Sequence, residues 1–431
     1  MEGYIFLIAF TVLFLFGMPI AGAMISSAFL YALIKGVDLA MMGTQMFTGL
    51  NTFVLISIPL FILTAEVMNR SSVADRIFNF CNSLVGYIPG GLGHVNVSTN
   101  LVFAGMSGSA VAGVGGIGHL GYQAMVKEGF DEEFSATITI ASSTLSPITP
   151  PSIPIVVYAM VSNVSVGRLL FGGILPGILM AILLSLYVFF VSRRRHYPYK
   201  KFSSWRIYFR DLLVTFIACI FPLLTPVILL GGIYMGVVTP TEAAAIAVLY
   251  ALVLGLFVYR KLGIKGLFGC FSTVFKTSGA ILLIIPAAKA FGLVLTRENI
   301  QQSFFNFVTG FAGTSPVLIA TCIMLLFLIV GLFNDPNVNI MLFVPMLLPL
   351  IEASGFDPVH MGLCIIINAM IGNTTPPVGI VTMTLCSLEK LSLERIYKAL
   401  TPLYFLLFAY DVVLLMFPQV ILFIPNYFFG K

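Results

Sequence analysis

Two short stretches place hydroxyl side chains beside paired prolines in the middle of long apolar segments. The first is SSTLSPITPPSIP at 142–154, and the second is GNTTPPVG at 372–379. Proline has no amide hydrogen and disrupts a helix, so nearby carbonyl groups are released from helical hydrogen bonding. Free carbonyl and hydroxyl oxygens suit a small cation such as Na⁺, and the N-termini of half-helices favour a carboxylate. A simple proline kink is the alternative for either stretch taken alone.

A short polar stretch precedes each of these motifs. GMSGSAVAGVGGIGHLG at 105–121 has seven glycines in seventeen residues, and GLFNDPNVN at 331–339 combines amides, a carboxylate and a proline. Glycine destabilises a helix interior by up to about 1 kcal/mol relative to alanine. Non-helical backbone at membrane depth survives only inside protein or beside water. We therefore expect two re-entrant hairpins with tips at 106–109 and 333–335. Close helix packing through small residues is the alternative for the glycine-rich arm.

The elements that must position these motifs are membrane-spanning helices. The chain has 431 residues, of which 59% are hydrophobic and 9% charged, and its mean hydropathy is +1.05. Soluble domains carry about 25% charged residues, so the composition predicts a polytopic α-helical membrane protein in a lipid bilayer. The net charge of +5 arises in short loops and indicates no nucleic-acid partner. The six cysteines and four histidines lack the spacing of a zinc site.

The apolar segments predict the crossings in the first half of the chain. We expect spans at 4–18, 20–36 and 46–68, an amphipathic surface helix at 71–86, the hairpin at 91–126, a broken span at 133–160 and a last span at 167–191. The stretch 192–211 holds seven Lys or Arg residues, so the positive-inside rule places it in the cytoplasm. A hairpin counts as no crossing, which leaves five crossings and predicts a periplasmic N-terminus.

The two halves of the chain share short identical stretches in the same order. LYAL occurs at 30–33 and 249–252, FNF at 78–80 and 305–307, GFD at 129–131 and 355–357, and TPP at 149–151 and 375–377. An odd number of crossings per half predicts two inverted-topology repeats, as in many secondary transporters. We expect the first repeat over 1–191, a basic loop over 192–210 and the second repeat over 211–431. In this division the scaffold helices are 4–36 and 211–258, the second hairpin is about 316–352 and the second broken helix is 357–386.

Isolated charges in the apolar segments have several interpretations. Asp335 lies at the second polar tip, and a carboxylate at membrane depth is costly and is taken as functional. Glu242 begins a helix in PTEAAA, where the helix dipole explains it. Glu66 either forms an ion pair with Arg70 or marks the membrane interface. Lys289 and Arg297 either attract an anionic substrate or extend to the membrane surface.

The combination of GMSGSAVAGVGGIG, GFD, TPP, MGVVTPTEAAA, FNDP and a second TPPVG resembles the large membrane subunit (DctM type) of tripartite ATP-independent periplasmic (TRAP) transporters. The resemblance covers nearly the whole chain. It implies an ion-transporter-superfamily fold with a fixed scaffold and a transport domain that moves by an elevator-type mechanism, and it implies no enzymatic activity. It further implies Na⁺-coupled symport of a small organic acid, such as a sialic acid or a C4-dicarboxylate, across the bacterial inner membrane, without an organic cofactor. The implied partners are a periplasmic substrate-binding protein and a small four-helix membrane subunit, which we expect to be a separate polypeptide.

Carried over residue by residue, the resemblance implies two Na⁺ sites between the tips and the broken helices. The first is formed by Ser107, Gly108 and Ser109 with Ser143, Thr144, Ser146 and Thr149. The second is formed by Asn334, Asp335 and Asn337 with Gly372, Asn373, Thr374 and Thr375. The implied substrate lies between the two tips, near Ser109, Pro150, Asp335 and Pro376.

Two other functions are open from the sequence. A stand-alone Na⁺- or H⁺-coupled organic anion carrier of the same superfamily would need no binding protein. Residues 105–108 also match the GxSG motif of intramembrane serine proteases of the rhomboid type, with Ser107 as nucleophile and His119 as its base. Proteolysis, however, gives no reason for the duplicated TPP motifs.

Overall fold

The computed structural model describes residues 5–202, 204–313 and 315–430, and every regular element among them is a helix. Residues 1–4, 203, 314 and 431 of the expected repeats and loop lie outside this description. Seven helical segments within the described ranges are long and apolar enough to cross a membrane. The prediction of an all-α, multi-pass membrane protein is thereby confirmed.

The first half of the chain contains α1 to α12. Their bounds are α1 (Ile5–Leu15), α2 (Ile20–Lys35), α3 (Leu39–Leu50), η2 (Phe53–Ile56), α4 (Ser57–Arg70), α5 (Val73–Val85), α6 (Gly91–Ser107), α7 (Ala110–Gly113), η3 (Val114–Gly118), α8 (His119–Lys127), α9 (Glu132–Ser143), α10 (Ile153–Ser162), α11 (Val166–Gly172) and α12 (Ile174–Arg195). Helices α6 and α7–η3–α8 form the first hairpin, while α9 and α10 are the halves of the first broken helix.

The second half of the chain contains α13 to α22. Its elements are α13 (Trp205–Tyr234), α14 (Pro240–Val253), η4 (Leu254–Val258), α15 (Ile264–Arg297), α16 (Ile300–Ala312), α17 (Pro316–Gly331), α18 (Pro336–Ala353), α19 (Pro358–Gly372), α20 (Ile380–Glu389), α21 (Leu393–Met416) and α22 (Pro418–Phe429). Helices α17 and α18 form the second hairpin, and α19 and α20 are the halves of the second broken helix. The hairpins and breaks therefore occur as a pair, at the places where the sequence motifs occur as a pair.

Two expected boundaries differ from the structure. The single span expected at 46–68 is wrong, because α3 ends at Leu50 and α4 begins at Ser57. The polar residues Asn51 and Thr52 interrupt the helix there, and a 3₁₀ turn follows. The basic loop expected over 192–210 is shorter at both ends, because α12 continues to Arg195 and α13 begins at Trp205 with the Ser204 hydroxyl as its N-cap.

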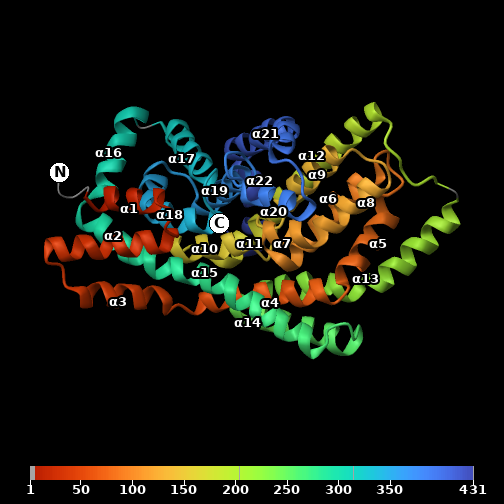
Figure 1. Ribbon diagram of the computed structural model, residues 1–431, viewed down its shortest axis with the longest axis horizontal. Helices are drawn as coiled ribbons and strands as arrows, with labels where there is room; N and C mark the ends of the chain where they lie inside the picture. Colours follow the sequence, from red (N-terminus) through yellow and green to blue (C-terminus); the bar gives the residue numbers. More distant parts are fainter. Residues whose placement is uncertain (1–4, 203, 314, 431) are drawn as a thin grey trace.

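The hairpins and broken helices pack across the two halves. Helix α10 of the first break contacts α18 of the second hairpin, and α20 of the second break contacts α7 and η3 of the first hairpin. Each outgoing arm also packs on the broken helix of its own half, since α6 contacts α9 and α17 contacts α19. The contacts between the halves bring both hairpin tips and both breaks to the middle of the molecule (Figure 1).

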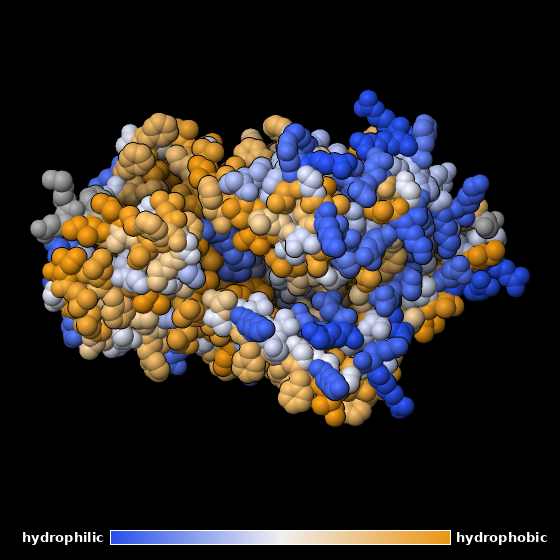
Figure 2. Space-filling model, viewed as in Figure 1, coloured by the Kyte–Doolittle hydropathy of each residue, from blue (hydrophilic) through white to orange (hydrophobic). Residues whose placement is uncertain are grey.

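A layer of long helices runs beside this central group. Helix α15 contacts α2, α3 and α4 and also reaches α18, and α14 contacts α4 (Figure 1). Figure 2 shows that hydrophilic residues gather over the end that carries α8, α12 and the start of α13. The opposite end, around α1 to α3 and α16, is mostly hydrophobic in the same view. The central polar motifs are therefore enclosed by apolar helices, as non-helical backbone in a membrane requires.

Candidate functional site

The first hairpin turns at a glycine that rests on the first break. Gly108 has φ +63°, and its carbonyl accepts a hydrogen bond from Ile153 N at 3.4 Å. A Cβ added to Gly108 would lie 2.5 Å from the carbonyl oxygen of Pro151, which is backbone and cannot easily move. Ser109 then caps the return arm by accepting from Ala112 N. Both the turn and the close approach therefore require glycine at this tip.

The second hairpin turns at polar residues and carries a charge. Asp335 caps α18, and its Oδ1 accepts from Asn337 N at 2.9 Å and from Asn337 Nδ2 at 2.7 Å. The outgoing arm ends at Gly331, which packs on Gly372 at the end of α19. A Cβ added to Gly372 would lie 2.9 Å from Gly331. The second tip is thus also fixed to the broken helix of its own half.

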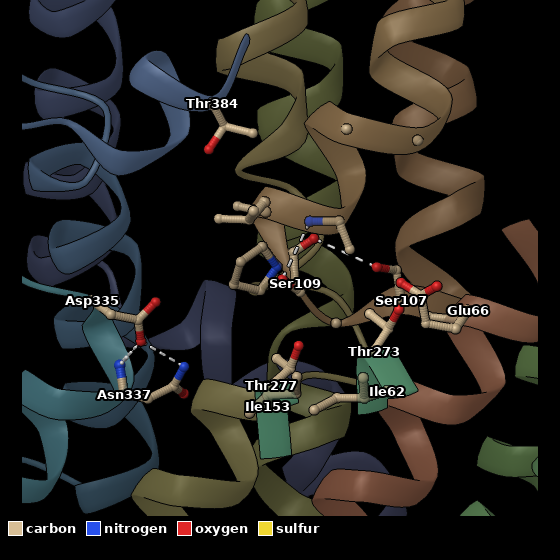
Figure 3. A pocket seen from close by; sticks show the side chains of 18 of the residues that line it. Ile62, Glu66, Ser107, Ser109, Ile153, Thr273, Thr277, Asp335, Asn337 and Thr384 are labelled. Atoms are coloured by element: carbon tan, nitrogen blue, oxygen red, sulfur yellow. Dashed lines mark hydrogen bonds between the residues drawn. The ribbon is translucent and has the colours of Figure 1, made fainter. Parts of the chain in front are cut away.

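Both tips line one cavity of about 880 Å³. Figure 3 shows Ser107 and Ser109 on one side of it, and Asp335 and Asn337 on the other. Other lining residues include Pro147, Ile153 and Asn373 at the breaks, Ile62, Glu66, Asn69 and Arg70 from α4, Thr273 and Thr277 from α15, His119 from the return arm and Thr384 from α20. The cavity is large enough for a small organic molecule.

Charged groups are few around this cavity. Arg70 is the one Lys or Arg among the described lining residues, and its Nε lies 3.6 Å from Glu66 Oε2. His119 Nδ1 lies 2.5 Å from Glu389 Oε1, a close contact that is not aligned as a hydrogen bond. This pair joins the return arm of the first hairpin to α20. The carboxylate of Asp335 is the charged group at the tips themselves.

Several buried oxygens beside the tips have no protein hydrogen-bond partner. In the first half these include Ser146 Oγ and Asn100 Oδ1, which lie 3.2 and 3.6 Å from the position of a Cβ on Gly113. In the second half they include Oδ1 of Asn337 and of Asn373. Buried polar atoms normally have partners, so an unpaired oxygen beside a helix break is a position that a cation or a water can fill.

The structure divides the predicted site residues into three groups. Those that line the cavity are Ser107, Gly108, Ser109, Asp335, Asn337 and Asn373. Those outside the lining are Ser143, Thr144, Ser146, Thr149, Asn334, Gly372, Thr374 and Thr375. The last group is the pair predicted for the substrate site, Pro150 and Pro376, which also lie outside the lining; Pro150 is buried and Pro376 is exposed.

Most hydroxyls of the broken helices donate back to their own helix. Ser143 and Thr144 donate to carbonyls three residues earlier, and Thr374 and Thr375 both donate to the Ile371 carbonyl. Thr149 donates to the Leu145 carbonyl, and its methyl group faces Gly177 of α12. Ser146 is therefore the hydroxyl of the first break whose oxygen is left unpaired.

Sequence reasoning missed several polar residues of the site. Asn100, Asn69, Thr273, Thr277 and Thr384 come from regular helices rather than from a tip or a break. Thr273 and Thr277 are one turn apart in the apolar helix α15, and this i, i+4 spacing is the signal that could have indicated them. Glu242, in contrast, has the structural role expected of it: its carboxylate and Thr239 form a capping box at the start of α14.

The arrangement gives no support to a serine nucleophile. The Ser107 hydroxyl donates to the Ser109 carbonyl at 3.5 Å, and His119 is held beside Glu389. Each residue is engaged with a different partner, whereas a nucleophile and its base must share a hydrogen bond.

Similarity to known proteins identifies the class of molecule that carries this site. The chain is 36% identical over 417 residues to the sialic acid TRAP transporter large permease protein SiaM of Vibrio cholerae, covering 96% of each chain. It is 33% identical over 386 residues to the C4-dicarboxylate TRAP transporter large permease protein DctM of Pseudomonas aeruginosa, covering 90% and 89%. The solved structure of the Alcanivorax borkumensis YdaH transporter shares the fold, with a TM-score of 0.56, 13% identity and 88% of each chain covered.

These relatives are transporter permeases and not enzymes. Residues 7–420 match the family described as "Tripartite ATP-independent periplasmic transporter, DctM component". The chain belongs to this family of membrane transporter components.

Proposed function

We propose that this chain is the large permease of a tripartite system that imports a small organic carboxylate together with Na⁺ across the bacterial inner membrane. The observation that carries the proposal is the single cavity to which both hairpin tips contribute. A periplasmic binding protein delivers the substrate, and a separate small four-helix membrane subunit completes the complex. In this proposal the loop 192–210 is cytoplasmic and the N-terminus periplasmic.

Helix termini and oxygens around the cavity support the substrate class. The return arm after Ser109, helix α10 and helix α18 all begin at the cavity, so their N-terminal partial positive charges favour an anion there. Arg70 also lines the cavity, but Glu66 balances its charge at 3.6 Å, so the attraction for an anion comes from the helix termini. The relatives named above are described as sialic acid and C4-dicarboxylate permeases, and both of these substrates are carboxylates.

The unpaired oxygens beside the tips support Na⁺ as the coupled ion. Ser146 and Asn100 lie beside the return arm of the first tip, and Asn373 and Asn337 lie near the second. A cation bound between a tip and its break would hold the hairpin closed and add positive charge next to the substrate carboxylate. Binding of ion and substrate would then favour each other, which is what symport requires.

The packing is compatible with an elevator-type motion. The hairpins and breaks contact one another across the two halves and can move as one body. We assign the fixed scaffold to the helices at 4–36 and 211–258, and α15 lies between this scaffold and the hairpin helix α18.

Reconstitution tests the proposal. Na⁺-driven uptake of a labelled organic acid in liposomes should require this chain, the small membrane subunit and the ligand-loaded binding protein. Ser107→Ala and Asp335→Ala should abolish it while the protein remains folded. Uptake by this chain alone would instead identify a stand-alone carrier. Equal uptake in a Na⁺-free proton gradient would contradict the assignment of Na⁺.

A further inference from the structure

A buried carboxylate outside the cavity joins helices α19 and α21. Asp411 on α21 is 1% exposed, and Asn368 on α19 is fully buried. Asn368 Nδ2 donates to Asp411 Oδ2 at 2.9 Å. The remaining oxygen of each side chain, Asp411 Oδ1 and Asn368 Oδ1, is buried and has no protein partner. Among the described residues, the amide of Asn368 is therefore the one hydrogen-bond donor to this carboxyl group, which lies inside the membrane-spanning part of the chain.

In the described ranges, no ion pair balances this carboxylate. The ion pairs found among the described residues do not include Asp411. The titratable neighbours that interact with it are Cys364 on α19 and Tyr410 on α21. Tyr410 donates its hydroxyl to the Pro176 carbonyl, and the Cys364 sulfur contacts His360. An ionised carboxylate without a counter-charge in such a place is strongly unfavourable.

We propose that Asp411 binds one proton and is held as a neutral carboxylic acid by Asn368. A carboxylic acid and a primary amide are complementary, since each offers one donor and one acceptor to the other. The amide donates to Asp411 Oδ2, and the acid donates from Oδ1 to Asn368 Oδ1. One proton then satisfies both unpaired oxygens and removes the net charge.

The oxygens at this place favour a proton over a metal ion. Hard cations such as Ca²⁺ take about six or more oxygen ligands, whereas two unpaired side-chain oxygens are present here. Asn368 and Asp411 lie in the interiors of α19 and α21, where the carbonyls are occupied by helical hydrogen bonds. This differs from the breaks at Ser146 and Asn373, where the helix is interrupted.

Infrared spectroscopy of the full chain in liposomes tests the proposal. The carbonyl band of a protonated carboxylic acid should be present in the wild type and lost in Asp411→Asn, so it should appear in their difference spectrum. This variant keeps a reciprocal pair, because two amides can also donate to each other. Absence of an acid band from the difference spectrum would overturn the proposal.

Two further variants make the result specific. Glu394→Gln removes an exposed carboxylate from the same helix, one that pairs with Lys398, and it should leave the acid band unchanged. Asn368→Leu keeps Asp411 but removes its amide partner, so the band should move to higher frequency. An unmoved band would contradict the pairing even if Asp411→Asn failed to fold. A band that disappears when Na⁺ is added would show that the site exchanges its proton for Na⁺ and would overturn the choice of a proton.

Discussion

The first hairpin turns at Gly108 and presents two neutral serines, whereas the second begins its return arm with the carboxylate of Asp335. The first tip touches its break through the backbone, from the Gly108 carbonyl to Ile153 N. The second uses its charge to hold its own turn, through two hydrogen bonds from Asn337. The two hairpin tips therefore solve one geometric problem in two ways. The first tip depends on the absence of a side chain and the second on the presence of one.

The largest effect is expected at the charged tip. Asp335→Asn should reduce Na⁺-driven uptake to background, because it keeps an N-cap but removes the negative charge from the cavity. A weakened N-cap would lower the stability of the helix by about 1 kcal/mol at most and would not by itself abolish uptake. Asp38→Asn is the matched control, since Asp38 caps α3 through Ala40 N at 2.9 Å away from the cavity. Equal loss in both variants would make the role of Asp335 structural.

A nearly equal loss is expected at the glycine tip. Gly108→Ala would place a methyl group 2.5 Å from the Pro151 carbonyl oxygen and should separate the tip from its break. Gly236 has a similar φ of +65° with open space around it, so Gly236→Ala reports the cost of the backbone conformation alone. We expect uptake to be lost in Gly108→Ala and retained in Gly236→Ala. The comparison of the tips fails if both variants transport equally well.

An intermediate effect is expected in the first broken helix. Ser146→Ala removes an unpaired oxygen beside the return arm and should raise the Na⁺ concentration needed for half-maximal uptake. Thr149→Val removes a hydroxyl that donates to Leu145, and it should shift that concentration much less. Titration of uptake with Na⁺ distinguishes the two. A larger shift in Thr149→Val would assign the ion to the Thr149 hydroxyl instead.

The smallest effect is expected on the wall that faces both tips. Thr277→Val removes a hydroxyl from the cavity lining and should raise the KM for substrate about two- to tenfold, which is the value of one neutral hydrogen bond of about 0.5–1.5 kcal/mol. Thr273→Val is the comparison, because the Thr273 hydroxyl already donates to the Gly269 carbonyl. An unchanged KM in Thr277→Val would show that the Thr277 hydroxyl of α15 does not contact the substrate.

Local sequence was sufficient to predict where the backbone departs from a helix. Gly108 and the prolines at 151, 336 and 377 change the conformation of the backbone next to them. Their effect can therefore be predicted without knowing which distant residues pack against them. The exception was the span expected at 46–68. The apolar residues on both sides of Asn51 and Thr52 led to the prediction of one continuous helix, whereas the structure interrupts the helix at these two polar residues.

The sequence by itself determined the all-α membrane class, the paired tips and breaks, and the family, because composition and backbone-breaking residues are local properties. Only the tertiary structure decided which side chains meet. Ser146 and Thr149 are three residues apart in one motif, yet one has an unpaired oxygen and the other packs on Gly177. Asn100 lies inside the regular helix α6 and gives no local signal. The face a helix turns toward a cavity depends on what packs against it, and those partners lie far away in the chain.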